Sequence, residues 1–310
     1  MDALNAVALE PGERAQPPRW HAHGWNRAGV YRACALTAGA LPRAARLALA
    51  SWLAARLGHR FTAERAAIEA SLARIVPEAG GEARVRLADE VFRHFALCFA
   101  DLVSANRRAS LAARLLARVD GAERFEAAAR AGRGFVVLTA HVGNWELAGR
   151  LLAGRTARPV YVVMAPEPNA AVARFLRPAD APVRFVTLGS PTLAVELVAA
   201  LRRGEIVALQ GDRALGTRGD AACEFFGAEA HFPLGPFVLA RAGGVPVIPV
   251  FCLLEPDRRY AVTVAEPIVV NGGGERAALA RWVATLEGVV RRHPEQWFNF
   301  YDVWSSGPAR

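Results

Sequence analysis

The sequence predicts an α/β fold with a mostly parallel central sheet, helices on both faces of the sheet and a helical extension at the N-terminus. From about residue 121 onwards, short apolar runs alternate with helical segments, which is the pattern of a parallel sheet. The run Phe135–Ala140 is apolar and partly β-branched, as in a strand buried on both faces. Between residues 30 and 119, by contrast, the periodicity is helical.

This change of pattern divides the chain into three regions. Residues 1–28 are rich in Pro, Gly, Arg and His and are predicted to form a loose N-terminal arm. Residues 29–119 are predicted to be a helical region suited to associating with a membrane, and residues 120–310 to be the α/β core. In the helical region, helices are expected over Leu41–Leu57, Ala63–Ile75 and Glu82–Ala105.

In the core, the expected strands and helices alternate along the chain. Strands are expected over Phe135–Ala140, Pro159–Met164, Arg184–Leu188, Ile206–Leu209, Val245–Leu253 and Ala261–Val264. Helices are expected over Glu123–Ala131, Trp145–Ala153, Asn169–Leu176, Thr192–Arg203, Gly235–Ala242 and Glu275–Arg292. Crossover connections between parallel strands are right-handed, and they place such helices on both faces of the sheet.

The first core strand leads directly into the hexapeptide 141–146, which reads His-Val-Gly-Asn-Trp-Glu. Gly143 lets the chain turn, Asn144 is a good N-cap, and Glu146 falls in the first turn of the following helix. Ligands of open α/β sheets bind at the carboxyl ends of strands. We therefore expect the functional site at His141.

His141 and Glu146 have the chemistry of a general base with its orienting carboxylate. A histidine accepts a hydroxyl proton near neutral pH, and a carboxylate bonded to its other nitrogen fixes the tautomer and stabilises the imidazolium. The turn contains no Ser or Cys in the position of a nucleophile elbow, so a substrate hydroxyl would attack directly. Taken alone, the pair has an ordinary explanation too, because an acidic residue in a first helical turn complements the helix dipole.

The composition indicates a globular protein with acidic partners. Of the 310 residues, 53% are hydrophobic, and the formal charge of +9 is carried by arginine because the sequence contains no lysine. Guanidinium groups bind phosphates and carboxylates, so anionic lipids, an acidic carrier protein, coenzyme phosphates and nucleic acid all match this charge. The arginines are spread over all segments, which argues against nucleic acid as a partner.

The cysteines and the apolar stretches exclude several other classes. The four cysteines include no Cys-x-x-Cys pair, which indicates neither a zinc site nor a disulfide framework. The first residues lack the pattern of a secretory signal. Pro42 and several arginines interrupt the apolar stretch 33–55, so no membrane span is expected. Residues 41–57 resemble an interfacial amphipathic helix, and a helix packed on the domain is an equal alternative.

Further motifs follow the predicted strands in the second half of the chain. An Asp-Arg pair at a second strand end can order a pocket wall or contact a phosphate, and it is also common in surface turns. Phe-Phe-Gly supplies an apolar wall with a backbone bend. In chain order, the motifs are Gly211-Asp212-Arg213, Phe225-Phe226-Gly227, Pro233-Leu234-Gly235-Pro236-Phe237, Gly244-Val245-Pro246-Val247-Ile248-Pro249 and His293-Pro294-Glu295-Gln296-Trp297.

In order and spacing, these motifs resemble the bacterial lipid A biosynthesis acyltransferases, also called late acyltransferases, over residues 80–305. The wider group is the lysophospholipid and glycerolipid acyltransferases, whose mark is His-x4-Asp or, as here, His-x4-Glu. The resemblance implies an enzyme that moves a fatty acyl chain from an acyl carrier protein or coenzyme A thioester to a hydroxyl of a lipid-type acceptor. It implies no metal and no cofactor beyond this acyl co-substrate.

The resemblance also implies roles for individual residues. His141 matches the family's general base and Glu146 its carboxylate partner. Arg150 lies four residues beyond Glu146 on the same helix face, where it could brace the carboxylate or contact an anionic substrate. The residues expected to bind substrate are Arg150, Asp212, Arg213, Phe225, Phe226, Glu295 and Gln296, and Phe232 and Trp297 are further candidates for an acyl-chain wall.

The sequence departs from the family pattern in two places. Typical members begin with a membrane-spanning helix, so its absence here favours peripheral attachment to the cytoplasmic face of the bacterial inner membrane, through its anionic lipids, or a partly soluble protein. The segment 297–302, Trp-Phe-Asn-Phe-Tyr-Asp, differs from the Tyr-x-Trp and basic pair of the lipid A enzymes. The acceptor could then be another lipid, or a polyene or aryl pigment precursor.

Two alternatives to acyl transfer follow from the same residues. An acyl thioester hydrolase on this scaffold would admit water where a transferase admits an organic hydroxyl. A basic binding protein without catalysis rests on the charge alone.

Overall fold

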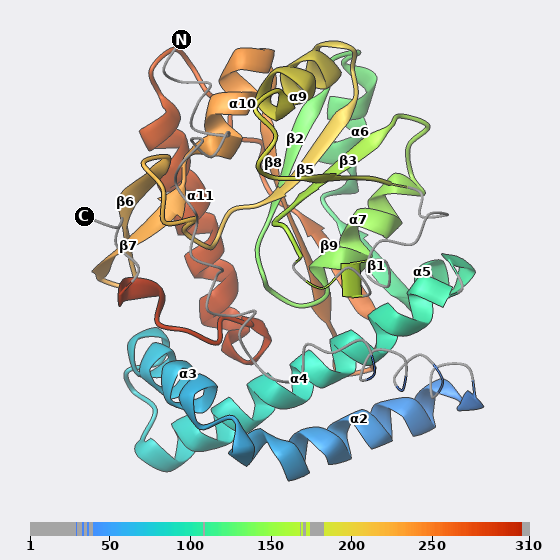
Figure 1. The fold of residues 1–310 in the computed structure, drawn as a ribbon, viewed down its shortest axis with the longest axis vertical. Coiled ribbons are helices and arrows are strands. Elements are labelled where there is room, and N and C mark those ends of the chain that lie inside the picture. The colour runs from blue at the N-terminus through green and yellow to red at the C-terminus, as the bar shows by residue number, and fades with distance from the viewer. Residues whose placement is uncertain are drawn as a thin grey trace.

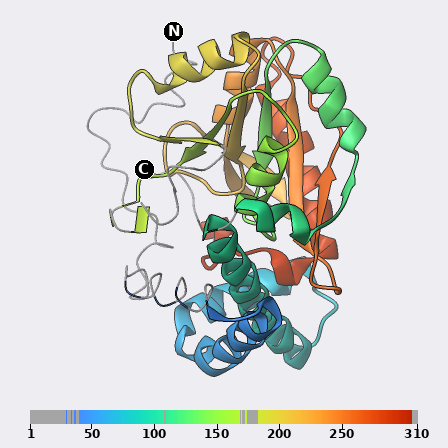
Figure 2. The same ribbon diagram turned by 90° about the vertical axis from the view of Figure 1, so that its right-hand side faces the viewer.

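The chain adopts the predicted α/β architecture in a computed structural model, which describes residues 40–107, 109–167 and 183–305 together with positions 29, 33, 36, 169, 172 and 173. Helices cover both faces of a seven-stranded sheet, and the N-terminal helices pack together at one end of it (Figures 1 and 2). The strand order is β1-β9-β8-β2-β5-β3-β4.

The sheet is mostly parallel. Strands β8, β2, β5, β3 and β4 run parallel to one another, whereas β9 is antiparallel to β8 and β1 is parallel to β9. A separate antiparallel hairpin is formed by β6 and β7. The strands are β1 Leu116–Asp120, β2 Phe135–Thr139, β3 Val160–Met164, β4 Arg184–Thr187, β5 Ile206–Gln210, β6 Asp220–Phe225, β7 Ala228–Pro233, β8 Val247–Leu254 and β9 Tyr260–Val264.

The helices form three groups around the sheet. Helices α9, α10 and α11 cover one face, α6 and α7 cover the other, and α2 to α5 lie across the end of the sheet below α7 (Figure 1). The helices are α2 Arg43–Leu57, α3 Thr62–Ile75, α4 Gly81–Arg107, α5 Ala109–Leu115, α6 Ala122–Arg130, α7 Trp145–Ala153, α9 Leu193–Arg202, α10 Gly235–Gly243 and α11 Glu275–Arg292. Short 3₁₀ turns are η2 Gly58–Arg60, η3 Pro294–Gln296 and η4 Val303–Ser305.

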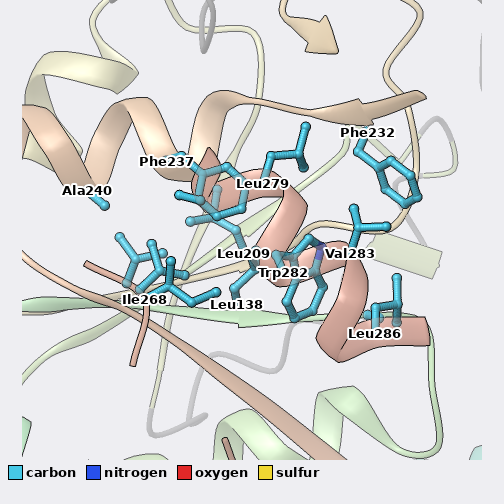
Figure 3. Packing of buried hydrophobic residues seen from close by; sticks show 14 of the residues in the cluster. Leu138, Leu209, Phe232, Phe237, Ala240, Ile268, Leu279, Trp282, Val283 and Leu286 are labelled. Atoms are coloured by element: carbon cyan, nitrogen blue, oxygen red, sulfur yellow. The ribbon is translucent and has the colours of Figure 1, made fainter. Parts of the chain in front are cut away.

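The face under α10 and α11 is a solid apolar core. Helix α11 places apolar side chains at a spacing of three and four residues, from Ala278 to Val290, and this stripe lies on β2 and β5. Figure 3 shows Trp282 among these side chains, close to Leu138 and Leu209. The Trp282 ring stacks on Phe251 at 5.7 Å, and each such buried side chain contributes about 1.5–3 kcal/mol.

A chain of buried polar contacts joins the helical layer to the sheet. The guanidinium of Arg43 in α2 donates to both carboxylate oxygens of Asp101 in α4, at 3.0 and 2.8 Å. The hydroxyl of Tyr260 in β9 donates to the same carboxylate at 3.1 Å, and it accepts from Asn144 Nδ2 at 3.2 Å. Asp101 is fully buried, so these hydrogen bonds take the place of those that its carboxylate would make with water.

The six predicted core strands and the helices around them are confirmed, with ends within two residues of the prediction. Strand β1, helix α5 and the β6–β7 hairpin were not predicted. Strand β1 lies at the edge of the sheet and has polar, half-exposed residues, so it lacks an apolar run, and it begins the sheet before residue 120. Most of the helix predicted over Asn169–Leu176 lies outside the described residues. Among the described helices, no segment is long and apolar enough to cross a bilayer.

Replacing Tyr260 with Phe should lower the free energy of unfolding by about 1.5–3 kcal/mol, because a buried carboxylate loses a hydrogen bond. Urea denaturation of the purified protein measures this loss. Tyr161→Phe is the matched control, since its hydroxyl accepts from Arg184 in an exposed hydrogen bond, where water can replace it. Equal stability losses in the two variants would contradict the importance of the buried contact.

Candidate active site

The topology brings the ends of β2 and β5 together. These strands are adjacent and parallel, and Thr139 pairs with Gln210 at their carboxyl ends. His141 and Asp212 each follow two residues later, so they emerge side by side at the same edge of the sheet. This edge is where ligands bind in open α/β sheets.

His141 and Asp212 form a buried pair with two hydrogen bonds. The Nδ1 atom of His141 donates to Asp212 Oδ1 at 2.8 Å, and the backbone N–H of His141 donates to Oδ2 at 3.0 Å. Asp212 is fully buried and His141 is 7% exposed. The ring of Trp145 meets the imidazole edge-on at 4.8 Å between centroids. The carboxylate therefore sets both the tautomer and the orientation of the imidazole.

The C-terminal segment completes the surroundings of Asp212. Trp297 Nε1 and Asn299 Nδ2 each donate to Asp212 Oδ2 at 3.3 Å. Burial by itself would raise the pKa of Asp212, but the charge and hydrogen bonds of His141 together with the positive charge of Arg213 outweigh burial and lower the pKa to about 2. Asp212 is therefore an anion throughout the physiological range.

The pKa of His141 is lowered from its ordinary value. Burial is the main cause, because it disfavours the charged imidazolium, and the positive charge of Arg213 acts in the same direction. The charge and the hydrogen bond of Asp212 oppose this shift. His141 is therefore neutral at pH 7, which is the protonation state that a general base requires.

The turn after His141 is held tightly against β8 and the C-terminal segment. Gly143 has φ +59°, and an added Cβ would lie 2.1 Å from the carbonyl oxygen of Cys252, so only glycine fits. The N–H of Gly143 donates to Gln296 O at 2.8 Å, and that of Asn144 donates to Cys252 O at 2.7 Å. Asn144 Oδ1 accepts from the Leu147 N–H at 3.3 Å, which confirms the predicted N-cap.

An apolar pocket opens beside the pair, between α7 and the face of strands β2, β3, β4 and β5. Thr139, Glu146 and Gln210 line the end of the pocket next to His141, and Phe125 and Ile206 line the end towards the start of the strands. The hydroxyl of Thr139 is buried and finds no hydrogen-bond partner among the residues that the structure describes. It is therefore available to a polar atom that enters the pocket.

Two of the predicted site residues lie in this pocket. Glu146 and Arg150 both line it from α7, one helical turn apart, as their spacing predicts. The carboxylate bonded to Nδ1 of His141 is nevertheless that of Asp212. The pairing of His141 with Glu146 stays a prediction.

Asp212 and Arg213 lie beside His141, and their expected contact with substrate stays a prediction. Asp212 is the hydrogen-bond partner of His141 Nδ1. Arg213 donates from Nε to Asn299 Oδ1 at 2.7 Å and from Nη2 to Phe298 O at 2.8 Å, which anchors the C-terminal segment beside Asp212. Its guanidinium also lies 5.8 Å from the ring centre of Tyr301.

The remaining predicted residues do not line the pocket described above. Phe225 is fully buried and packs on Phe226 with ring centres 4.7 Å apart, in the core under α11, on the opposite face of the sheet. Gln296 uses its amide on the backbone of Leu254, accepting from N and donating to O at 2.9 Å each. Glu295 belongs to the 3₁₀ turn η3, and its Oε1 atom lies 3.8 Å from His293 Nδ1. Their expected contact with substrate stays a prediction.

The sequence prediction missed Asp212 as the partner of His141. Both strand ends were predicted, but the neighbours of β2 in the sheet were not, because strand order depends on crossovers between elements far apart in the chain. The signal that could have revealed the pair was the equal offset of His141 and Asp212 beyond two buried strands. Asn299 had no comparable signal, since it lies outside any strand or helix.

Comparison with known proteins identifies the family. The sequence profile of the bacterial lipid A biosynthesis acyltransferases matches residues 21–306. The chain belongs to this family. It is also similar to the phosphatidylinositol mannoside acyltransferase of Mycobacterium tuberculosis, with 28% identity over 224 residues that cover 69% of this chain and 66% of the relative. The enzyme of the same name from Mycolicibacterium smegmatis is 27% identical over 187 residues, which cover 56% and 58% of the two chains. The matched region thus spans less than two thirds of the length of these relatives.

Thiol chemistry does not fit the described site. Cys98 and Cys252 lie beside the turn, since their carbonyl oxygens accept from Asn144. Burial raises the pKa of Cys98 to about 12 and that of Cys252 well above its ordinary value. Both thiols are therefore protonated near pH 7, in the state that is not nucleophilic.

Two substitutions should move the pKa of His141 in opposite directions. Asp212→Asn removes an anion that favours the imidazolium, so the pKa should fall further, and Arg213→Gln removes a cation that disfavours it, so the pKa should rise. Titration of the histidine ring signals by NMR measures both shifts. Asp89→Asn, an exposed change in the helical layer, is the control. Shifts of the same sign in both variants would contradict the electrostatic assignment.

Proposed function

We propose that the protein transfers a fatty acyl chain from a thioester to a hydroxyl of a lipid-type acceptor, with His141 as the general base. The observation that carries the proposal is the buried His141–Asp212 pair, which follows the strand ends that line an apolar pocket. A neutral imidazole oriented by an anion suits proton abstraction, and an apolar pocket beside it suits a fatty acyl chain. Membership of an acyltransferase family supports this combination.

The proposed reaction needs no covalent enzyme intermediate. His141 accepts the proton of the acceptor hydroxyl at Nε2, because Nδ1 is bonded to Asp212. The hydroxyl oxygen then forms the ester bond to the thioester carbonyl carbon, the carbon–sulfur bond breaks, and the imidazolium returns its proton to the leaving thiolate. Asp212 stabilises the transient imidazolium without becoming protonated.

The oxyanion formed during attack needs hydrogen-bond donors from the end of the pocket next to His141. The turn cannot offer the N–H groups of Gly143 and Asn144, since both donate to backbone carbonyls. The hydroxyl of Thr139 is our candidate donor, because it is buried and lines the pocket from the end of β2. Arg150 lies in the same pocket and adds positive charge there.

For the donor, we propose an acyl carrier protein or coenzyme A thioester, both of which are anionic and complement an arginine-rich chain. For the acceptor, we propose a lipid whose headgroup carries free hydroxyls. The family description refers to lipid A, whereas the relatives above are named for a phosphatidylinositol mannoside. Both of these acceptors are lipids that carry sugar groups, and we propose a lipid of this class as the acceptor of this chain.

Substituting His141 with Ala should abolish acyl transfer and leave the chain folded but less stable, because Asp212 loses the imidazole and keeps its hydrogen bonds from Trp297 and Asn299. The assay supplies an acyl thioester with and without a lipid extract and follows thiol release and ester formation. Acceptor-dependent ester formation by the natural protein is the expected result. Thiol release without acceptor would support a hydrolase instead, and turnover in folded His141→Ala protein would refute the mechanism.

The two carboxylates near His141 can be separated in the same assay. Asp212→Asn should reduce kcat by about 10³–10⁴, the effect of disturbing an orienting carboxylate in a serine protease triad. Glu146→Gln should have a smaller effect if Glu146 positions substrate in the pocket. A larger loss of kcat in Glu146→Gln than in Asp212→Asn would assign the orienting role to Glu146, as the sequence motif predicts.

We further propose that α2 attaches the protein to an anionic membrane surface. Trp52 and Leu53 are 56% and 39% exposed, and Ala44, Ala48 and Ala55 are exposed on the same helix. An exposed apolar helix face is uncommon on a protein that meets only water. Arg56 lies within 5.8 Å of the Trp52 ring, so aromatic and cationic groups occur together, as in helices that lie in a membrane interface.

Trp52→Ala should weaken binding to vesicles of phosphatidylglycerol and phosphatidylcholine by about tenfold, through the lost burial of an aromatic ring. Flotation of the protein with vesicles at low and high salt measures the effect. Val195→Ala, which changes an exposed apolar residue on α9, is the matched control. Equal binding by both variants would argue against α2 as the attachment surface.

A further inference from the structure

A glycine lies in the middle of the helix that covers the pocket. Gly149 is an interior residue of α7, which runs from Trp145 to Ala153. Glycine in a helix interior is less favourable than alanine because it loses more backbone freedom on folding. The φ angle of Gly149 is not positive, so its backbone conformation does not require glycine.

Close packing does not explain Gly149 either. A Cβ added there would meet no atom of the described residues within 4 Å. At Gly211, by contrast, an added Cβ would lie 2.8 Å from Leu138 Cδ1, so that glycine is needed for packing. Gly149 lines the apolar pocket beside Ala148. Among the described residues, the space beside Gly149 is therefore open, and it borders the pocket.

Gly149 lies about halfway along the pocket. Helix α7 starts at Trp145, whose ring touches His141, and a rise of about 1.5 Å per residue places Gly149 about 6 Å further in. The opposite wall runs along β5 from Gln210 to Ile206, which is about 13 Å at the rise of a strand. A chain that reaches the far end must therefore pass Gly149.

We propose that Gly149 is a specificity-determining residue that opens the inner half of the pocket to long acyl chains. The inference rests on the proposed acyl transfer and adds its substrate class, namely long-chain acyl donors. A long chain passes between Gly149 and the strands towards Phe125, whereas a short chain ends before the glycine. A larger side chain at position 149 closes this passage.

The test compares Gly149→Ala and Gly149→Leu with the natural protein, using butanoyl, octanoyl and hexadecanoyl donors on coenzyme A and on acyl carrier protein with a lipid acceptor. The ratio of kcat/KM for hexadecanoyl to that for butanoyl donors should fall at least about tenfold in Gly149→Leu, because several methylenes lose their place in an apolar pocket. Gly149→Ala should show a smaller fall. Its Tm should nevertheless rise by about 2 °C, since alanine favours the helix.

Gly288→Leu is the matched control, because Gly288 is also a helix-interior glycine with room for a Cβ, in α11 and outside the pocket lining. It should keep the natural chain-length ratio. If the natural protein is active and both Gly149→Leu and Gly149→Ala keep its chain-length ratio, the role of Gly149 is overturned. A natural protein that transfers none of these acyl groups would remove the proposed function, and this inference with it. Should Gly149→Leu fail to fold, Gly149→Ala decides by the same ratio.

Discussion

A buried carboxylate must be satisfied by partners that the fold holds in place, and at Asp212 these partners come from distant parts of the chain. His141 follows β2, while Trp297 and Asn299 belong to the C-terminal segment. An unpaired charge at such a position would cost several kcal/mol, so the three segments must assemble together. The position of His141 beside Asp212 is thus tied to the satisfaction of one buried charge. This charge also explains why a segment without regular structure, residues 297–302, is well buried around Asn299 and Phe298.

The two faces of the sheet serve different purposes. Under α10 and α11, large side chains such as Trp282 and Phe251 fill the space completely, and the indole N–H of Trp282 donates to Gly211 O next to Asp212. Under α7, the helix carries Ala148 and Gly149 where it faces the strands, and the interior stays open. A close-packed face resists deformation, whereas an open one can admit a flexible chain. The dyad lies on the boundary between them, supported on one side and accessible to a ligand on the other.

The sequence predicted those parts of the molecule that local patterns determine. The strand Phe135–Thr139, the cap at Asn144 and helix α11 each have an apolar period or a capping residue that acts within a few positions. The motif at 141–146 pointed to the sheet edge at which His141 pairs with Asp212. The partner of His141 could not be predicted in the same way, because it depends on β5 lying beside β2. The same reason applies to Phe225 and Gln296. A phenylalanine suits a substrate pocket as well as it suits the core, and a glutamine can bind a substrate as well as a backbone segment.

The polar contacts from Arg43 to Asn144 have a consequence for how the chain is made. During synthesis, α2 and α4 leave the ribosome before β9, so Asp101 forms without the hydroxyl of Tyr260 that later bonds to it. The apolar side of α4 also lacks its cover, because Phe298 arrives only near the C-terminus. The helical layer therefore cannot mature as an independent N-terminal unit. The helical layer completes its burial only when the last tenth of the chain has been made.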